Sequence, residues 1–175
     1  MAEEIKTQSI EDEMFLVDDD ETSLTDKYLL FNLGGEEYGI DISRVTGIEE
    51  LQKITHVPDM PAYMKGVINL RGRVIPVIDL RLRFGMEDRE YDDRTCIIVC
   101  DVRDMTIGLI VDTVTVVLDI EGKNIEPPPS FKSESGKERY ISGLARVDEA
   151  VKILLDVEKI LKEEELHKIQ DDVKE

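Results

Sequence analysis

The segment GVINLRGRVIPVIDL, residues 66–80, contains two apolar runs joined by Leu70-Arg71-Gly72-Arg73, and it ends close to an aspartate, Asp79. The β-branched residues of both runs suit a pleated surface. Gly72 provides the positive φ that a tight turn needs. The second run is apolar on both faces, and Pro76 removes one ladder donor from it. The sequence therefore predicts a β-hairpin whose second strand lies between two layers, with a sheet edge or a bulge at Pro76.

Similar patterns predict further strands and short helices along the chain. Residues 43–51 fit a helical turn and a bent strand equally well, and both readings stay open. Pro61 suits the first turn of a short helix through Lys65, and Gly85 ends a helical turn over 80–84. Other strands are expected at 27–33, 36–42, 95–101, 105–111, 114–120, 140–147 and 150–156, with a closing helix at 157–169.

Two blocks of the sequence recur at nearly the same shift. Tyr38-Gly39-Ile40, with Val45 and Ile48, returns 69 residues later as Ile107-Gly108-Leu109, with Val114 and Val117. A second block returns after 77 residues, so that Gly66, Val74, Ile78, Asp79 and Leu80 match Gly143, Val151, Leu155, Asp156 and Val157. A duplication with four or five short strands in each copy predicts two small β-barrels.

The net charge of −18 is concentrated at the two ends of the chain. Residues 1–26 contain ten acids and one lysine, and residues 156–175 contain eight acids and four lysines. We expect 1–26 to be a disordered acidic tail. Duplex binding needs a basic face, which this composition does not favour. With no signal segment at the start and no apolar run of about 20 residues, we predict a cytoplasmic protein.

The residue pattern does not favour catalysis, a metal site or a cofactor. Cys96 and Cys100 lie four residues apart on one predicted strand, too far apart for a disulfide, among apolar neighbours that indicate core thiols. Neither His56 nor His167 has a second ligand at metal-binding spacing. We therefore predict a protein that is not an enzyme, with no metal and no cofactor.

Several segments together resemble the CheW family of chemotaxis coupling proteins. They are NLRG at 69–72, PVIDLR at 76–81, FNLGGEEYGIDISRV at 31–45 and ISGLARVDEAVKILLDVEKIL at 141–161. The resemblance implies a mainly-β domain at 27–162 built of two five-stranded SH3-like barrels on a shared core, with a short helical connector and a C-terminal helix. Barrel one is expected at about 27–84 and barrel two at about 94–156, with an exchange of strands left open. Residues 157–175 are expected to form the C-terminal helix and acidic tail.

The resemblance also implies a function and a set of contacts. Family members couple a CheA-type histidine kinase to the cytoplasmic tip of chemoreceptors. Related domains also end CheA and begin CheV, and at 175 residues we expect no kinase or receiver domain beside this module. The positions implied in kinase binding are Val45 and Ile48, on an exposed apolar face. Those implied in receptor binding are Arg71, Gly66 and Val117, in a groove between the barrels.

Arg71 also stands out without the resemblance. It belongs to a basic group, Lys65, Arg71, Arg73, Arg81 and Arg83, inside an acidic protein. At a hairpin tip its guanidinium can reach outward and bind a carboxylate with two parallel bonds, whereas Arg81 and Arg83 fit bridges to the protein's own acids equally well. Gly47 departs from the family, which often has glutamate there.

The alternative function is that of a small β-barrel that binds ligands or nucleic acid. Such a protein needs aromatic side chains as stacking platforms, and this chain has no Trp and only nine Phe and Tyr in total.

Overall fold

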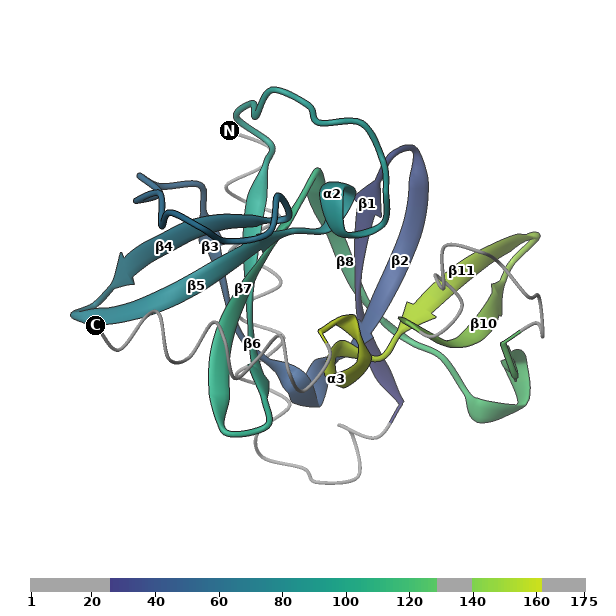
Figure 1. Ribbon diagram of the computed structural model, residues 1–175. Coiled ribbons are helices and arrows are strands. Elements are labelled where there is room, and N and C mark those ends of the chain that lie inside the picture. Colours follow the sequence, from purple (N-terminus) through teal and green to yellow (C-terminus); the bar gives the residue numbers. More distant parts are fainter. Residues whose placement is uncertain (1–25, 129–139, 162–175) are drawn as a thin grey trace.

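The computed structural model describes residues 26–128 and 140–161, and most of them belong to strands (Figure 1). Three short helical turns, η2, α2 and η3, link strands, and a fourth, α3, follows the last one. In chain order the elements are β1 Lys27–Leu33, β2 Glu36–Asp41, η2 Ile42–Arg44, β3 Val45–Glu50, β4 Met64–Leu70, β5 Arg73–Asp79, α2 Leu80–Arg83, β6 Cys96–Val102, β7 Met105–Val111, β8 Thr113–Asp119, η3 Gly122–Asn124, β9 Ile125–Glu126, β10 Ile141–Val147, β11 Ala150–Leu155 and α3 Val157–Ile160.

The predicted central hairpin is confirmed as β4 and β5. Both turn residues have positive φ, 53° for Arg71 and 85° for Gly72, which is the requirement of a two-residue type I′ turn. The predicted sheet edge or bulge at Pro76 is wrong, because β5 is an inner strand between β7 and β4, although its parallel pairing with β7 begins only at Val77, directly after the proline. The second strand is buried from Ile75 to Asp79, but Val74 near the tip is 56% exposed.

The strands form two sheets, and each sheet takes strands from both halves of the chain. One has the order β3-β6-β7-β5-β4 and the other β8-β1-β2-β11-β10-β9. Parallel pairs join the halves, since β2 lies beside β11 and β5 beside β7. The mainly-β fold with two small barrels is thus confirmed, with a two-residue sixth strand added. The sheets do not follow the continuous ranges 27–84 and 94–156, because the strands are exchanged.

The predicted duplication accounts for this exchange. Strands β1 to β5 correspond to β6, β7, β8, β10 and β11. Replacing each strand of the first sheet by its counterpart reproduces the order of the second sheet without β9. Local details repeat as well, because the bulge at Met64/Gly66 in β4 returns at Ile141/Gly143 in β10.

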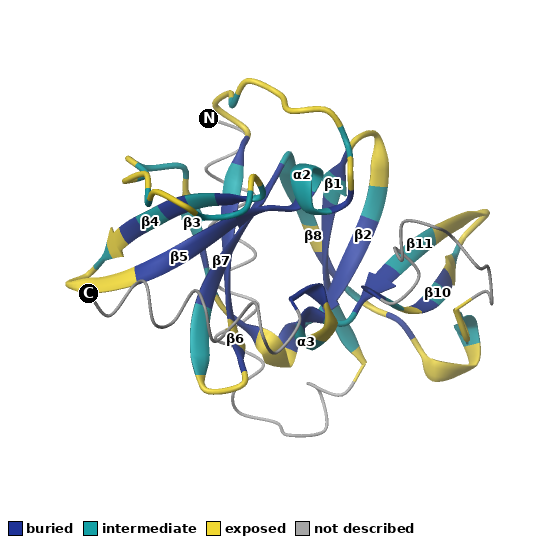
Figure 2. Cartoon of the chain, viewed as in Figure 1, coloured by how far each residue is buried: buried dark blue, intermediate teal, exposed yellow. Residues whose placement is uncertain are grey.

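The largest hydrophobic cluster lies between the two sheets and includes side chains from both, such as Leu29 and Ile40 from one and Ile98 and Leu109 from the other. Figure 2 shows that burial is greatest where the strands of the two sheets meet, and that the hairpin tips are exposed. Each sheet has a smaller cluster of its own. This arrangement confirms the shared core.

Further local expectations were wrong or incomplete. Residues 61–65 do not form a helix: the Met64 N–H donates to the Pro61 carbonyl over 2.9 Å in a turn, and β4 begins at Met64 because Met64, Gly66 and Ile68 alternate inward. Residues 43–51 contain both of the structures left open, a helical turn and a strand: residues 43–44 end η2, and β3 follows at Val45–Glu50. Helix α3 ends at Ile160, because Leu161 has an extended backbone with φ of −118° and ψ of 140°, so the predicted closing helix does not continue through residue 161. Residues 162–169 of that helix, and residues 1–25 of the predicted acidic tail at 1–26, lie outside the described residues.

The expected exposed apolar face on β3 is wrong. Val45 is 7% exposed and Ile48 is 5% exposed, and both belong to the shared cluster. Ile48 and Val117 occupy corresponding positions of the duplication, on the edge strands β3 and β8, and Val117 is buried in the same cluster.

We predict that Ile48→Asp prevents stable folding. The substitution removes a buried isoleucine, at about 1.5–3 kcal/mol, and leaves a carboxylate in an apolar cluster without an ionic partner. Thermal melting measured by circular dichroism should lose its cooperative transition. Thr46→Asp, which adds the same charge at an exposed position of the same strand, should keep it. A cooperative melt of the Ile48 variant near the parent temperature would contradict the assignment of Ile48 to the core.

Candidate functional site

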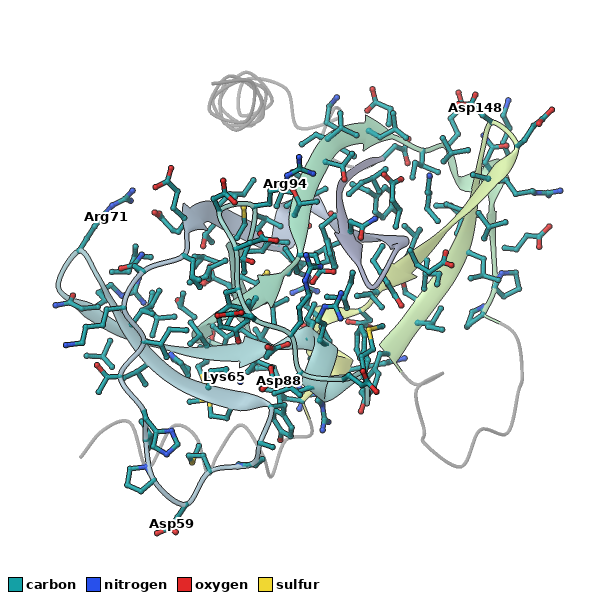
Figure 3. All side chains as sticks on the ribbon, turned by 90° about the horizontal axis from the view of Figure 1, so that it is seen from above. Asp59, Lys65, Arg71, Asp88, Arg94 and Asp148 are labelled. Carbon is teal, nitrogen blue, oxygen red and sulfur yellow. The ribbon has the colours of Figure 1, made fainter. Side chains whose placement is uncertain are left out.

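Arg71 projects from the tip of the β4–β5 hairpin, away from the body of the molecule (Figure 3). Its side chain is 84% exposed, and its backbone has the left-handed conformation that favours Gly, Asn or Asp over Arg. The corresponding residue of the duplicated hairpin is Asp148, which also has positive φ and lies at the opposite end of the molecule. An arginine at this position is therefore not what the turn itself prefers.

A groove of about 240 Å³ lies beside this tip. It is bounded by the edge strand β3 on one side and the β4–β5 hairpin on the other, with β6 and β7 contributing the rest. Its lining residues are Thr46, Gly47, Glu49, Leu70, Arg71, Arg73, Ile75, Val99, Asp101 and Thr106. Because acids and arginines both line it, the groove suits mixed-charge protein surface better than a run of phosphates.

The contact between Arg71 and Glu49 across this groove is weak. Their nearest nitrogen and oxygen are 3.4 Å apart, longer than the 2.7–2.9 Å typical of a charge-assisted hydrogen bond. Arg81 shows the opposite case, because its Nε and Nη2 donate to the two oxygens of Asp112 over 2.7 and 2.6 Å, with both side chains largely buried. Arg81 therefore bridges to an internal acid, as one of its two readings predicted, and Arg71 stays available.

Other members of the basic group have structural partners. The Arg83 guanidinium stacks between the rings of Tyr63 and Tyr140, 4.5 and 5.2 Å from their centroids, and its Nε donates to the Ile160 carbonyl over 2.7 Å. Lys65 lies 3.4 Å from Asp88. Arg73 donates to the Thr106 hydroxyl over 3.1 Å. Of the five, Arg71 combines a long contact, 3.4 Å to Glu49, with the side chain that is 84% exposed.

The other predicted receptor residues do not reach the surface as Arg71 does. Gly66 is buried with φ of 146°, and a Cβ there would lie 2.1 Å from the Thr55 carbonyl oxygen. That carbonyl accepts a hydrogen bond from the Val67 N–H, while the Thr55 N–H donates back to Val67. Gly66 thus lets the 51–57 segment lie against the edge of β4. Val117 is buried in the other sheet.

Sequence reasoning missed two acidic residues that matter here, Glu49 and Asp112. Asp112 accepts from Arg81, from Arg89 and from the Gly34 N–H, so it joins three segments. Burial opposes its ionisation, but these hydrogen bonds outweigh that effect and hold the pKa of Asp112 below its usual value. Its signal in the sequence is a single acid between two apolar runs, IGLIV and TVTVV.

The cysteines have the environment of core thiols. Burial raises the pKa of Cys100 to about 12, which leaves its thiol protonated and unreactive. Both cysteines are free, and Cys96 is partly buried. Within residues 26–128 and 140–161, no three His, Cys, Asp or Glu side chains gather as a metal site would require. No helix in that part of the chain is long and apolar enough to cross a membrane.

These features define a protein-interaction module: two exchanged β-barrels that present an exposed arginine beside a groove. Comparison with known proteins shows the family to which the chain belongs. The CheW-like domain model matches residues 27–165. The chain is 40% identical over 140 residues to the chemotaxis protein CheW of Klebsiella aerogenes, covering 80% of this chain and 84% of that protein. It is 43% identical over 104 residues to CheW of Bacillus subtilis, covering 59% and 67%.

A solved structure agrees with these sequence matches. The crystal structure of the scaffolding protein TtCheW from Thermoanaerobacter tengcongensis superposes with a TM-score of 0.73 at 35% identity, covering 78% of this chain and 92% of that one. The chain belongs to the CheW family of chemotaxis scaffold proteins.

We predict that Gly66→Ala disrupts the contact between the 51–57 segment and β4, and that any loss of partner binding follows from this change. The added Cβ cannot coexist with the Thr55 carbonyl, so the Thr55–Val67 pair should open. Amide hydrogen exchange at Thr55 and Val67 should speed up, with a fall in melting temperature. Gly72→Ala is the control, since it also has positive φ but meets nothing within 4 Å. Unchanged protection of both amides, combined with lost receptor binding, would instead make Gly66 a direct contact.

We predict that Asp112 contributes a pH-dependent part of the stability. Because the folded-state pKa is lowered, its contribution is present above the unfolded pKa of about 3.9 and is lost as pH falls through the folded value. Asp112→Asn should lower the free energy of unfolding near pH 7, by about 1–3 kcal/mol, and the difference should narrow below pH 4. Urea titrations across pH 2.5–7 measure this. A constant difference over the whole range would contradict it.

Proposed function

We propose that this protein is a non-enzymatic adaptor that couples a CheA-type histidine kinase to the cytoplasmic tip of chemoreceptors. In this proposal it is cytoplasmic and is recruited to membrane-associated receptor arrays. The observation that carries the proposal is the exposed Arg71. It lies at the tip of the hairpin that bears the family's NLRG motif, and it occupies a turn position that does not itself favour arginine.

Arg71 is the proposed receptor contact. An exposed guanidinium on a rigid two-residue turn can bind a carboxylate with two parallel hydrogen bonds. The hairpin holds it through the β4–β5 pairing and through the Gly72 N–H, which donates to the Asn69 side chain over 2.9 Å. Gly66 supports this hairpin from inside, because it is buried in β4. Val117 is buried in β8 of the other sheet, and its receptor role stays a prediction from the family resemblance.

The kinase contact through Val45 and Ile48 stays a prediction from the family resemblance. Because both side chains face the core, their proposed role is to hold β3 in shape rather than to cover the kinase domain directly. The side chains that β3 itself exposes are Thr46 and Glu50. Among described residues β3 pairs only with β6, so its outer edge is open to a partner.

We predict that Arg71→Ala separates binding from folding. Its exposed side chain makes no core contact, so the variant should melt within a few degrees of the parent. An interfacial arginine is a frequent hot spot, and its loss commonly costs about 2 kcal/mol or more of binding. Receptor control of kinase activity in reconstituted arrays should therefore be lost.

Arg73→Ala is the matched control for this experiment, because Arg73 is also exposed and close to the tip but donates to Thr106. It should retain most of the coupling. Full receptor control of the kinase by the Arg71 variant would contradict the proposal. So would a large fall in its melting temperature, which would show that the arginine serves the fold.

A further inference from the structure

The groove beside Arg71 lies between the two edges of the five-stranded sheet. Strands β3 and β4 are those edges, and the sheet is curved so that the Arg71–Glu49 contact spans from the β4–β5 turn back to β3. The contact is long, and Arg71 is almost fully in solvent. An exposed ion pair of this kind contributes little to stability. A better-placed carboxylate could therefore replace Glu49.

The floor of the groove is apolar. Ile75 and Val99 lie beneath it, with only 2% and 3% of their surfaces exposed, and Leu70 lies half-buried at its side. Gly47 keeps the space above them open. A Cβ on Gly47 would meet only the Glu49 carboxylate, at 3.9 Å, and the backbone there has no positive φ that would require glycine. The missing side chain at position 47 therefore forms part of the groove.

Another part of the groove lining, formed by Arg73, Thr106 and Asp101, is already hydrogen-bonded within the protein. Arg73 donates to the Thr106 hydroxyl over 3.1 Å, and that hydroxyl donates to Asp101 over 2.9 Å. This chain of hydrogen bonds neutralises one side of the groove. The remaining charge that a partner can engage is Arg71, with Glu49 beside it as the competing acid.

We propose that this groove receives a receptor segment that places one carboxylate beside one aliphatic side chain. The carboxylate takes the place of Glu49 on Arg71, and the aliphatic side chain occupies the space that Gly47 leaves over Ile75 and Val99. The proposal rests on the receptor contact assigned to Arg71 and extends it. Glu49 becomes an internal competitor that lowers receptor affinity, and Gly47 becomes the residue that sets which side chain fits.

The competitor role is tested with Glu49→Gln, which keeps the shape of the side chain and removes its charge. Binding of a purified chemoreceptor cytoplasmic fragment to the full chain, measured by isothermal titration calorimetry, should tighten about two- to fivefold. The gain should disappear in an Arg71→Ala background, because nothing remains to compete for. Glu50→Gln, the same change on the neighbouring exposed residue outside the groove lining, is the control and should leave affinity unchanged.

The proposed role of Gly47, which is to leave room in the groove for a receptor side chain, is tested with side chains of increasing size at position 47. Gly47→Leu fills the groove and should weaken binding of the receptor fragment at least tenfold. Gly47→Ala adds only one methyl group and should weaken it much less. Gly47→Ala should melt at or above the parent temperature, since its Cβ would meet only the Glu49 carboxylate, at 3.9 Å. Melting of Gly47→Leu within a few degrees of the parent is the check that this variant is folded. Binding of a CheA regulatory domain should stay the same.

Each outcome separates this inference from the proposed function. If Arg71→Ala leaves receptor binding intact, both are wrong. If Arg71→Ala abolishes binding but Glu49→Gln and Gly47→Leu change nothing, the adaptor proposal survives and the groove proposal is overturned. Loss of kinase-domain binding, rather than receptor binding, in Gly47→Leu also overturns it. So does a gain from Glu49→Gln that persists without Arg71.

Discussion

The parallel pairings β2–β11 and β5–β7 are the contacts on which the rest of the molecule depends. Each joins a strand from one half of the chain to a strand from the other, so neither sheet can be completed by one half alone. Gly39 and Gly108 make these pairings possible, because a Cβ at either would lie 2.9 Å or less from side chains of the facing strands. The two barrels therefore fold as one unit, with their largest hydrophobic cluster between them.

This arrangement makes the molecule a rigid support for its exposed tips. A run of aromatic rings joins the six-stranded sheet to the end of α2, with centroid distances of 5.4 to 5.9 Å between neighbours; its members are Phe31 of β1, Tyr38 of β2, Phe84 after α2 and Tyr140 before β10. Arg83 extends that run by stacking on Tyr140 and Tyr63. The two duplicated hairpins then point to opposite ends, one with Arg71 at its tip and the other with Asp148 (Figure 3). Duplication has thus produced one scaffold with two chemically different ends.

Local pattern was enough to predict most strands, the Arg71-Gly72 turn and the duplication, because alternation and turn chemistry are short-range signals. Local pattern failed at residues 61–65, where Pro61 suggested a helix. The pairing of β4 with β5 instead makes a strand from Met64 onward. Local pattern also failed at Val45 and Ile48, since an apolar residue on an edge strand looks the same in sequence whether it faces a partner or the core. Glu49 escaped notice because its role arises from curvature that brings β3 to the β4–β5 tip. The position of Arg71 was predictable, since a glycine-backed turn defines a hairpin tip.

In the proposed role, one chain holds a kinase and a receptor at the same time. This role is tested most directly by asking whether this protein retains a CheA regulatory domain on an immobilised chemoreceptor cytoplasmic fragment. We expect saturable retention that requires the full chain and is absent when the chain is omitted. Binding of either partner that displaces the other would contradict it, because the two contacts would then share one surface.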